Sequence, residues 1–287
     1  MDPSLRELRS FVAVADEGTF TDAALALGVS QAAVSRSVAA LEGRLGARLL
    51  RRTPRGAHPT GLGHDLLPRI RRILAEVDAL AESARTRHEI LRLGYAWAAV
   101  GSHTPDLLKR WSAAHPATEL RLVKHNSATA GLDEGVTDAA IVRVEVDAAR
   151  HDSVVVGLER RLVVFAADDP AWSRRRSLTM NEIAERTVLV DPRTGTTRPE
   201  LWPAAHRPES HVLPASDVDA WLDAVAAGQG VGTTAEATAA HHPRPGIAYR
   251  RISDGPRIPV RLAWRREDPP AAIAALASLL TSLYEAD

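Results

Sequence analysis

The chain contains no cysteine, so disulfides, thiolate metal sites and cysteine nucleophiles are all excluded. It also lacks any run of about 18 apolar residues, and we therefore expect no membrane span. The N-terminal residues Met1–Ser4 do not form the cationic region followed by an apolar stretch that a signal peptide requires. Together these absences lead us to expect a cytoplasmic protein.

Net charge is absent as well, because 36 lysines and arginines balance 36 acidic residues. Lysine is almost missing: only Lys109 and Lys124 are present, and the arginine bias along the whole chain is most simply compositional. A hydrophobic content of 45% and a charged content of 25% are typical of a soluble globular protein. The 287 residues suffice for two domains. Any case for nucleic-acid binding must therefore rest on local clusters of residues.

Residues 19–55 have the pattern of two helices joined by a tight turn and followed by an arginine-rich tip. Thr19 or Thr21 can cap the first helix, and Gly28 supplies a turn in which a residue without Cβ takes a positive φ at little cost. Ser30 is a good N-cap for the second helix, because its hydroxyl can accept an orphan backbone N–H. Four apolar residues at helical spacing predict one buried stripe in that helix: Val34, Val38, Leu41 and Leu45.

The opposite face of this second helix carries short or forked hydrogen-bonding side chains at its N-terminal end, which a recognition helix presents to base edges. Gln31 can offer a bidentate amide to an adenine, and Arg36 can reach a guanine or a phosphate. After Gly46 ends the helix, arginines around Thr53-Pro54 indicate a hairpin-like wing on the phosphates. The candidate DNA-binding residues are Ser30, Gln31, Ser35, Arg36, Arg51, Arg52 and Arg55. For each arginine the alternative is a solvated charge, and Glu42 is expected to be structural.

Residues Leu5–Thr60 resemble the winged helix-turn-helix head of LysR-type transcriptional regulators. The matching positions are Leu8 and Phe11, Gly18-Thr19-Phe20-Thr21 with Ala23-Ala24, Leu27–Gln31, Val34-Ser35, Leu41-Glu42, Leu45-Gly46, and Leu49–Arg52. Two local departures, Ala32 in place of a proline and Pro59 in place of a leucine, bear on wing shape and sequence preference. The resemblance implies double-stranded DNA as a partner and a regulator rather than an enzyme.

A long helix is predicted after the wing, with Thr60 as its cap and Pro68 bending it near its start. Its apolar residues alternate in steps of four and three, as in the seam of a coiled coil: Leu66, Ile70, Ile73, Val77, Leu80 and Ala84. The alternative is an amphipathic helix packed on its own domain. In the resembled family this helix joins two heads, and the resemblance implies a homodimer that commonly assembles into a homotetramer.

Beyond the polar hinge Arg85–Glu89, strands and helices alternate, which favours an α/β architecture with largely parallel sheets. The strands are expected at Ile90–Gly94, Glu119–Lys124, Ala139–Val142, Leu162–Ala166, Val188–Val190 and Val260–Trp264. The helices are expected at Thr104–Ala114, Ala128–Gly135, Asn181–Glu185, Val218–Ala227 and Ala271–Tyr284.

This second half resembles the effector-binding part of the same family, which has a periplasmic-binding-protein-like fold of two subdomains. The fold class expected for the whole chain is thus a helical winged helix-turn-helix head plus an α/β effector domain. The expected boundaries are 1–59 for the head, 60–89 for the dimerisation helix and hinge, and 90–287 for the effector domain. Within the last, subdomain I takes about 91–160 and 265–287, and subdomain II about 161–264.

A ligand cleft is expected where the loops after the strands of the α/β half converge. Those loops are Tyr95–Thr104, Asn126–Thr129, Asp191–Arg198, Pro214–Asp217 and Thr233-Thr234. The candidate effector-binding residues are Trp97, Ser102, His103, Thr104, Ser127, Thr194, Thr196, Thr197 and Thr233. Hydroxyls, a helix N-terminus and an aromatic floor predict a small carboxylate or aromatic acid as the effector. For each residue the alternative is an ordinary turn or capping role.

Two other functions stay open at this point. One is a small-molecule-binding protein or enzyme that keeps a vestigial helix-turn-helix for dimerisation, and the other is an architectural DNA binder without a ligand. Ser102, His103 and Asp106 do not make a convincing catalytic trio, because adjacent serine and histidine side chains rarely point at each other. His241-His242-Pro243 lacks metal-ligand spacing, and Gly228–Gly232 lacks the following helix of a dinucleotide fingerprint. We expect no metal and no cofactor.

Overall fold

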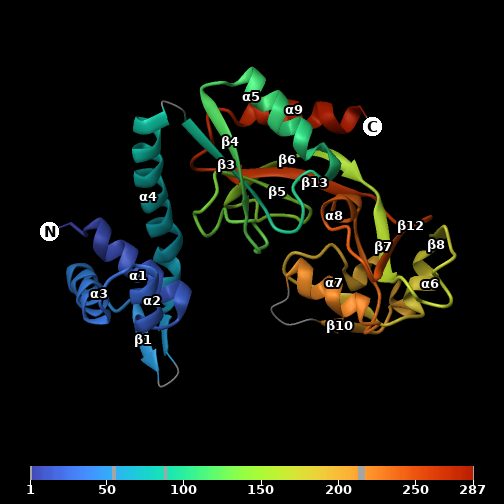
Figure 1. Cartoon of the computed structure of the whole chain (residues 1–287), viewed down its shortest axis with the longest axis horizontal. Coiled ribbons are helices and arrows are strands. Elements are labelled where there is room, and N and C mark those ends of the chain that lie inside the picture. The colour runs from blue at the N-terminus through green and yellow to red at the C-terminus, as the bar shows by residue number, and fades with distance from the viewer. Residues whose placement is uncertain (1, 54–55, 87–88, 213–216, 287) are drawn as a thin grey trace. The chain divides into compact units, whose positions relative to one another are not determined.

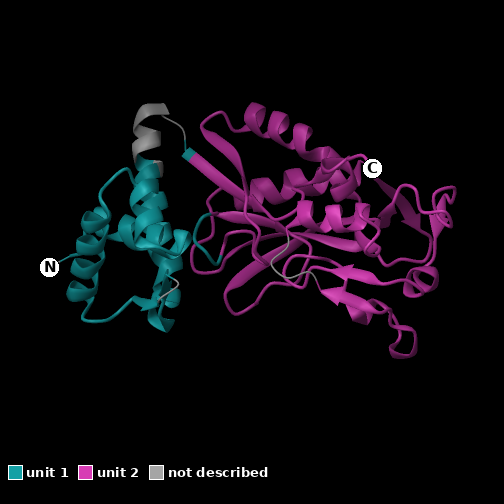
Figure 2. Ribbon diagram, turned by 60° about the horizontal axis from the view of Figure 1, so that its bottom comes forward, with its two compact units in different colours: residues 1–89, 133–136 teal, residues 90–132, 137–287 magenta. Residues whose placement is uncertain are grey.

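The computed structural model describes residues 2–53, 56–86, 89–212 and 217–286, with the side chains of 79 and 81–86 also left out. Figure 2 shows two compact units: residues 1–89 with 133–136, and residues 90–132 with 137–287. The first unit holds the predicted head and the long helix, and the second holds the α/β half. Each is described by itself below.

The head is built from three helices, α1 (Leu5–Glu17), α2 (Phe20–Ala26) and α3 (Gln31–Leu45), whose ends follow the local sequence (Figure 1). The Thr19 hydroxyl accepts the N–H of Asp22 at 3.0 Å and caps α2. The Ser30 hydroxyl accepts the N–H of Ala33 at 3.2 Å and caps α3. Gly46 ends α3 with a φ of +66°. These predicted helix ends are confirmed.

One apolar core joins the three helices. The buried residues are Leu8, Phe11, Val14, Phe20, Ala23, Ala24, Val34, Val38, Leu41, Leu49, Leu50, Ala57, Ile70 and Leu74. Of the four residues predicted for the stripe on α3, three are buried, but Leu45 is 42% exposed. The prediction is wrong there, because the last turn of α3 extends past this core.

Strands β1 (Leu50–Thr53) and β2 (Gly56–Pro59) form the antiparallel wing, and α4 (Gly61–Thr86) follows it. The Thr60 hydroxyl accepts the N–H of Gly63 at 3.1 Å, so the predicted cap of α4 is confirmed. The predicted seam divides between two faces of the helix. Ile70 lies in the head core, whereas Ile73 is 48% and Leu80 72% exposed. The position of Ala84 in the predicted seam lies outside the described side chains.

The second unit contains a five-stranded sheet in the order β4-β3-β5-β13-β6. Its strands are β3 (Glu89–Tyr95), β4 (Thr118–Lys124), β5 (Ala139–Val142), β6 (His151–Glu159) and β13 (Ile258–Arg265). Helices α5 (Thr104–Ala114) and α9 (Ile273–Glu285) contact each other, and α9 also packs against β6. Trp111, Leu262 and Leu280 are among the buried residues of this core.

The other sheet has the order β11-β7-β12-β8, beside a pair of parallel strands, β9 and β10. The strands are β7 (Arg161–Ala166), β8 (Ser177–Leu178), β9 (Val188–Val190), β10 (Ser210–Val212), β11 (Gly232–Ala235) and β12 (Ile247–Ile252). The helices are α6 (Met180–Ala184), α7 (Val218–Ala226) and α8 (Glu236–His241). Two buried apolar clusters pack around this sheet; Phe165 belongs to one and Trp221 to the other.

Three expectations for this unit are wrong. The sheets are not largely parallel, since β13 pairs antiparallel with β5 and β6, and β7 pairs antiparallel with β11 and β12. Strand β13 exists as predicted but lies in the five-stranded sheet rather than in subdomain II, because the chain crosses back before it, after β12. Residues 128–135 form turns and not a helix, since Ala130, Gly131 and Gly135 all have positive φ.

Among the described residues, no single helix is long and apolar enough to cross a membrane. One bent pair, α2 with α3, passes by length and composition alone. Phe20, Val34, Val38 and Leu41 of this pair lie in the head core described above, whereas Leu25 and Leu45 are exposed.

Candidate functional site

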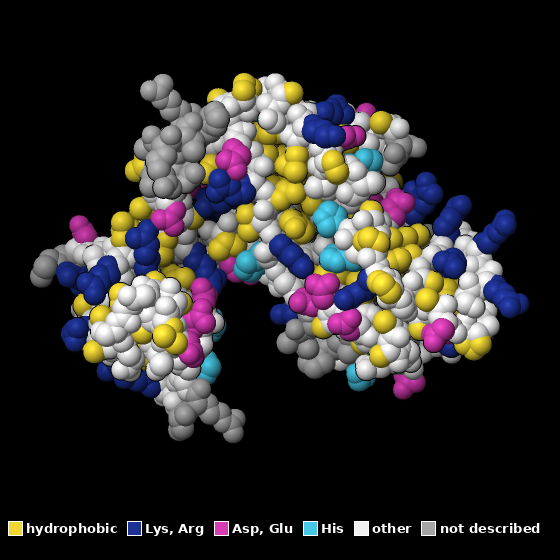
Figure 3. All heavy atoms as spheres, in the orientation of Figure 1, with side chains coloured by type: hydrophobic (Ala, Val, Ile, Leu, Met, Phe, Trp, Pro, Cys, Tyr) yellow, Lys and Arg dark blue, Asp and Glu magenta, His cyan; other side chains and the backbone are white. Residues whose placement is uncertain are grey.

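The N-terminal half of α3 presents a solvent-exposed face above the buried stripe of the same helix. Gln31, Ala32 and Arg36 are exposed, while Val34 and Val38 are buried beneath them. Ser35 is half-buried, and the Ser30 hydroxyl is engaged in the cap of the helix. Figure 3 shows lysine or arginine side chains over α3 and close to β1. The N-terminal end of α3 therefore has a polar, solvent-exposed face.

Arg52 ties the wing to the helices. Its Nη2 donates a hydrogen bond to the Ser35 hydroxyl at 3.0 Å, and its guanidinium lies 4.4 Å from the centre of the Phe20 ring. Both contacts hold the side chain in place, and a guanidinium carries five N–H groups, so most of its donors remain for other acceptors. Two predicted DNA-binding residues, Ser35 and Arg52, are thus joined in one arrangement.

The base of the wing is fixed by a buried carboxylate. Glu42 Oε1 accepts the backbone N–H groups of Leu49 at 2.8 Å and Leu50 at 3.0 Å, which places the start of β1 against α3. Its Oε2 lies 3.4 Å from Nη1 of Arg48. Glu42 is therefore structural, as predicted.

The far strand of the wing is held by backbone contacts. The Ala57 N–H donates to the carbonyl of Gly18 at 2.7 Å. A Cβ on Gly56 would lie 2.4 Å from that carbonyl oxygen, so this close approach requires glycine. On the near strand, the exposed Arg51 sits opposite His58 and makes no hydrogen bond or ion pair with the described residues. Arg55 lies outside the described residues.

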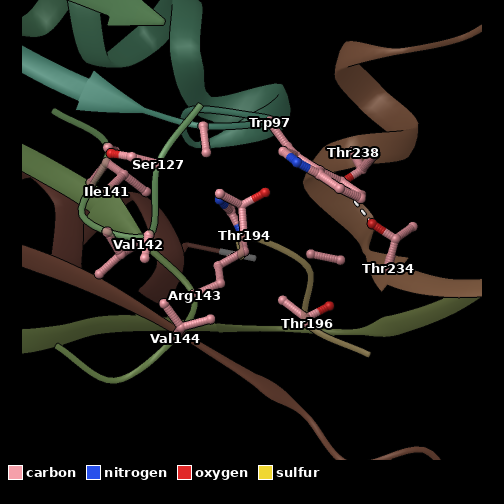
Figure 4. A pocket seen from close by; sticks show the side chains of 14 residues that line it. Trp97, Ser127, Ile141, Val142, Arg143, Val144, Thr194, Thr196, Thr234 and Thr238 are labelled. Carbon is pink, nitrogen blue, oxygen red and sulfur yellow. Dashed lines mark hydrogen bonds between the residues drawn. The ribbon is translucent and has the colours of Figure 1, made fainter. Parts of the chain in front are cut away.

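The second unit contains a cleft of about 450 Å³, open solvent at its mouth included (Figure 4). It lies where both sheets end: Trp97 follows β3, Ile141 and Val142 belong to β5, and Thr234 belongs to β11. Four of the predicted effector residues line it, namely Trp97, Ser127, Thr194 and Thr196. Thr234, from one of the predicted cleft loops, also lines it, whereas Arg143 and Thr238 line it but were not predicted.

Trp97 forms one wall of the cleft. Its ring packs against the Trp221 ring with 5.1 Å between centroids. The indole Nε1 is buried and has no hydrogen-bond acceptor among the described residues. A buried donor without a partner costs free energy, so this N–H is an unsatisfied polar group of a residue that lines the cleft.

Arg143 is a cation of the lining that is already neutralised. Its Nε and Nη2 donate to the Glu159 carboxylate at 2.8 and 2.7 Å, and its Nη1 and Nη2 donate to the carbonyls of Ala98 and Ala99. Burial opposes its charge, but the adjacent Glu159 carboxylate outweighs this effect and raises the pKa of Arg143. The sequence gives no local signal for this pair, because its two members are 16 residues apart, one just after β5 and one at the end of β6, and β13 separates these strands in the sheet.

The cleft wall also contains strained backbone. Ala130 has a φ of +49°, a conformation that L-residues with a Cβ adopt at a cost of about 1–2 kcal/mol. The close approach of the Ala130 backbone to β3 requires glycine at position 94, because a Cβ on Gly94 would lie 2.0 Å from the Ala130 carbonyl oxygen. Nearby, the Thr194 hydroxyl donates to Asp191 at 2.5 Å and lies 3.3 Å from Asn126. The turn and the loop that face each other across the cleft are thus both held by specific contacts.

Five predicted effector residues do not line this cleft. Ser102 and His103 line a separate cavity with Glu159 and Tyr284, and the His103 ring lies 4.8 Å from the Tyr284 ring. Thr104 lines neither cavity. Thr197 and Thr233 are buried behind the wall, where their hydroxyls lie 2.7 Å apart. Of the loop Pro214–Asp217, only Asp217 is described, and its carboxylate caps α7.

The remaining titratable clusters have structural partners. His242 Nε2 lies 2.8 Å from the carbonyl oxygen of Trp97, and the Tyr249 hydroxyl donates to the His242 carbonyl at 3.1 Å. Burial lowers the pKa of the neighbouring His241, with help from the charge of His242. Within the described ranges, no group of three histidine, aspartate or glutamate residues is placed to hold a metal ion.

Comparison with known proteins assigns both units. Residues 5–64 match the model of the bacterial regulatory helix-turn-helix protein, lysR family, and residues 84–284 match the LysR substrate binding domain. The chain belongs to the LysR family of transcriptional regulators. It is 30% identical to the HTH-type transcriptional regulator IlvR of Caulobacter vibrioides, over 96% of this chain and 97% of that one. The vestigial-helix alternative is not supported, because such relatives of this LysR-type regulator are transcriptional regulators and not enzymes.

Solved structures support the fold of this LysR-type regulator. CbnR, a LysR family transcriptional regulator, matches with a TM-score of 0.72 at 22% identity, covering 98% of this chain and 99% of that one. Full-length CbnR complexed with its target DNA matches with a TM-score of 0.71 at 22% identity, over 98% and 100% of the two chains. The probable hydrogen peroxide-inducible genes activator of Mycobacterium xenopi is 33% identical over 61% of this chain and 95% of its own. Cysteine oxidation, the usual protein chemistry of peroxide, is not available to a chain without cysteine.

Proposed function

We propose that this LysR-type regulator reads its operator with the outer face of α3 and holds the DNA backbone with its wing. In this proposal Gln31 and Arg36 contact base edges in the major groove, Ser30 and Ser35 contact phosphates or bases, and the wing arginines contact phosphates. The single observation that carries it is the exposed face of the N-terminal half of α3, with Gln31 and Arg36, above the buried Val34 and Val38. The tie of Arg52 to Ser35 supports it, because the wing and α3 are held in one register.

The test separates base contacts from phosphate contacts. We expect Arg36→Ala to weaken binding to the operator, found by selecting bound fragments from the host genome, more than binding to random DNA. We expect Arg51→Ala to weaken both equally and to lower the slope of log affinity against log salt by about 0.9. Arg6→Ala is the control, because Arg6 is an exposed arginine of α1 and belongs to neither α3 nor the wing. Equal losses for Arg36→Ala would reduce it to a phosphate contact, and an unchanged slope would place Arg51 off the DNA.

We infer further that α4 pairs two heads in a homodimer, and that dimers pair into a homotetramer. Ile73 and Leu80 support this, because they lie seven residues apart on one helix and are 48% and 72% exposed. A heptad spacing of exposed apolar residues is the pattern that a second helix covers. Two heads on neighbouring half-sites would double the contacts of one recognition helix. Because its proposed partner is double-stranded DNA, we infer that the protein acts in the cytoplasm.

We infer that the cleft binds a small organic or aromatic acid. The buried Nε1 of Trp97 supports this, since it awaits an acceptor such as a carboxylate oxygen. Thr194, Thr196 and Ser127 bring hydroxyls to the same walls. A ligand can regulate only through different affinities for two arrangements of the regulator, and a cleft between two subdomains is suited to that.

A thermal-shift screen of organic acids tests the effector class. We expect at least one acid to stabilise the full chain, and Trp97→Phe to lose most of that shift, because it keeps an aromatic ring but removes the N–H. Trp172→Phe is the matched control, since Trp172 is buried in another core and does not line the cleft. A folded protein that no acid stabilises would refute the acid effector and favour a DNA binder without a ligand.

A further inference from the structure

A buried arginine stands behind the wall of the cleft. Arg161 begins β7, and its side chain is buried. Its Nη1 donates to the Thr196 carbonyl at 2.9 Å and lies 3.4 Å from the hydroxyls of both Thr196 and Thr233. Its Nε donates to the carbonyl of Pro256 at 3.3 Å. Three of the residues that the sequence suggested for the effector, Thr196, Thr197 and Thr233, therefore form the surroundings of this arginine.

Every partner of Arg161 is neutral, and no carboxylate pairs with it among the described residues. Other arginines with little exposure have one: Arg143 pairs with Glu159, and Arg92 pairs with Asp138, both at 2.7 Å. Buried charges are ordinarily paired, because removing an ion from water costs several kcal/mol. Burial lowers the pKa of Arg161 to about 10, so the guanidinium stays charged at neutral pH without a countercharge.

The location of this charge gives it a consequence for the ligand. Thr196 lines the cleft (Figure 4). Its carbonyl accepts from Nη1 of Arg161, which is not itself a lining residue, so the cation lies directly behind the cleft wall. The other cation at the cleft, Arg143, is neutralised by Glu159. An uncompensated charge in a poorly hydrated wall projects a positive potential into the adjacent space, where solvent screening is weak.

We propose that Arg161 is the specificity-determining residue of the cleft, which selects anionic over neutral ligands through its charge behind Thr196. This inference rests on the proposed effector function and deepens it. Arg161 acts as a positioning residue, because the Thr196 carbonyl and hydroxyl stand between its guanidinium and the ligand. The ligand it selects carries one negative charge, whose attraction to the guanidinium replaces the missing countercharge.

A purely structural role would also explain part of the geometry. Arg161 joins the start of β7 to the loop with Thr196, to β11 through Thr233 and to the segment before β13 through Pro256. Any substitution will therefore lower stability, and stability alone cannot test the proposal. The readout must be the ratio of affinities for a charged and a neutral form of the same ligand, which a structural defect does not change.

The experiment uses the full chain and pairs of a carboxylate with its primary amide: benzoate with benzamide, phenylacetate with phenylacetamide, and pyruvate with pyruvamide. Titration calorimetry gives the acid-to-amide ratio of affinities for each protein. We expect Arg161→Gln to lower that ratio by roughly tenfold or more, the effect of one weakly screened charge at a few ångströms. Arg161→Lys should keep most of the ratio. Arg257→Gln should keep all of it, since it removes an exposed arginine from the same segment as Pro256.

An unchanged ratio in Arg161→Gln overturns the inference while leaving an acid effector in place. Equal affinities for acids and amides in the unmodified protein also overturn it. If none of these acids binds, or if Arg161→Gln does not fold, a second experiment tests the inference. Crystals of the unmodified protein are soaked in bromide, and the anion is located by its anomalous scattering. Anomalous density for bromide against the Thr196 hydroxyl supports Arg161 as the source of anion selection even if the acid effector fails. A cleft without bromide overturns the inference.

Discussion

The buried carboxylate of Glu42 gives the sharpest prediction about the head. Only about a tenth of its side chain is exposed, and one oxygen accepts two backbone N–H groups at 2.8 and 3.0 Å. Glu42→Ala leaves both N–H groups of Leu49 and Leu50 buried without an acceptor. Each such loss costs about 1–3 kcal/mol, so we expect a loss of unfolding free energy of roughly 3–5 kcal/mol in the head. Glu42→Gln keeps an acceptor oxygen and should cost roughly 1–2 kcal/mol.

Two assays check this prediction on the full chain. Chemical denaturation gives the free energy of unfolding, and hydrogen exchange followed by mass spectrometry reports on peptides that cover β1. We expect the backbone N–H groups of Leu49 and Leu50 to exchange faster in Glu42→Gln than in the unmodified protein, and fastest in Glu42→Ala. Affinity should fall for all DNA sequences, because the wing loses its register against α3. Glu17→Gln is the control, since Glu17 is exposed at the end of α1. A loss below about 1 kcal/mol with unchanged exchange would refute the reasoning.

Two further predictions concern assembly and pH. Ile73→Asp should shift the protein toward a monomer in sedimentation velocity, whereas Leu25→Asp, at a still more exposed leucine of α2, should not; a matching effect of both would remove α4 from the interface. Burial lowers the pKa of His241 below 6.5, so the unfolded chain takes up the proton first as the pH falls. Stability is therefore fully present above pH 6.5 and lost as the pH falls through the folded pKa. His241→Gln should flatten the fall in melting temperature between about pH 7.5 and 5.5 relative to the exposed His206→Gln; parallel curves would contradict this.

The head could be predicted from the sequence because local interactions determine its elements. Thr19, Ser30 and Thr60 satisfy backbone N–H groups only three residues away, and Gly46 ends a helix by its own φ. The apolar period of α3 selects its buried face without reference to the rest of the chain. Two predictions for this unit were wrong: Leu45 is exposed, and the seam residues of α4 divide between two faces. Both depend on which other element packs against each helical turn, and the local sequence does not specify that.

The effector half was predicted less well, because its decisive contacts join residues far apart in the chain. The sequence suggested hydroxyl-rich loops, and Trp97, Ser127, Thr194 and Thr196 do line one cleft. Ser102 and His103 were expected beside them but face another cavity, because the turn that carries them packs against Tyr284 and α8 instead. Strand β12 was not predicted, since Arg250 and Arg251 interrupt its apolar pattern.

By itself the sequence determined the two-part plan, the caps and turns of the head, the outward face of α3 and the threonines of the effector half, since each is set by neighbours within a few residues. Tertiary structure alone decided the rest. In the folded chain β13 lies in the five-stranded sheet, Arg143 pairs with Glu159, and Arg161 is buried among neutral oxygen atoms. Pairing and burial of charge depend on distances between distant segments, and spacing along the chain does not encode those distances.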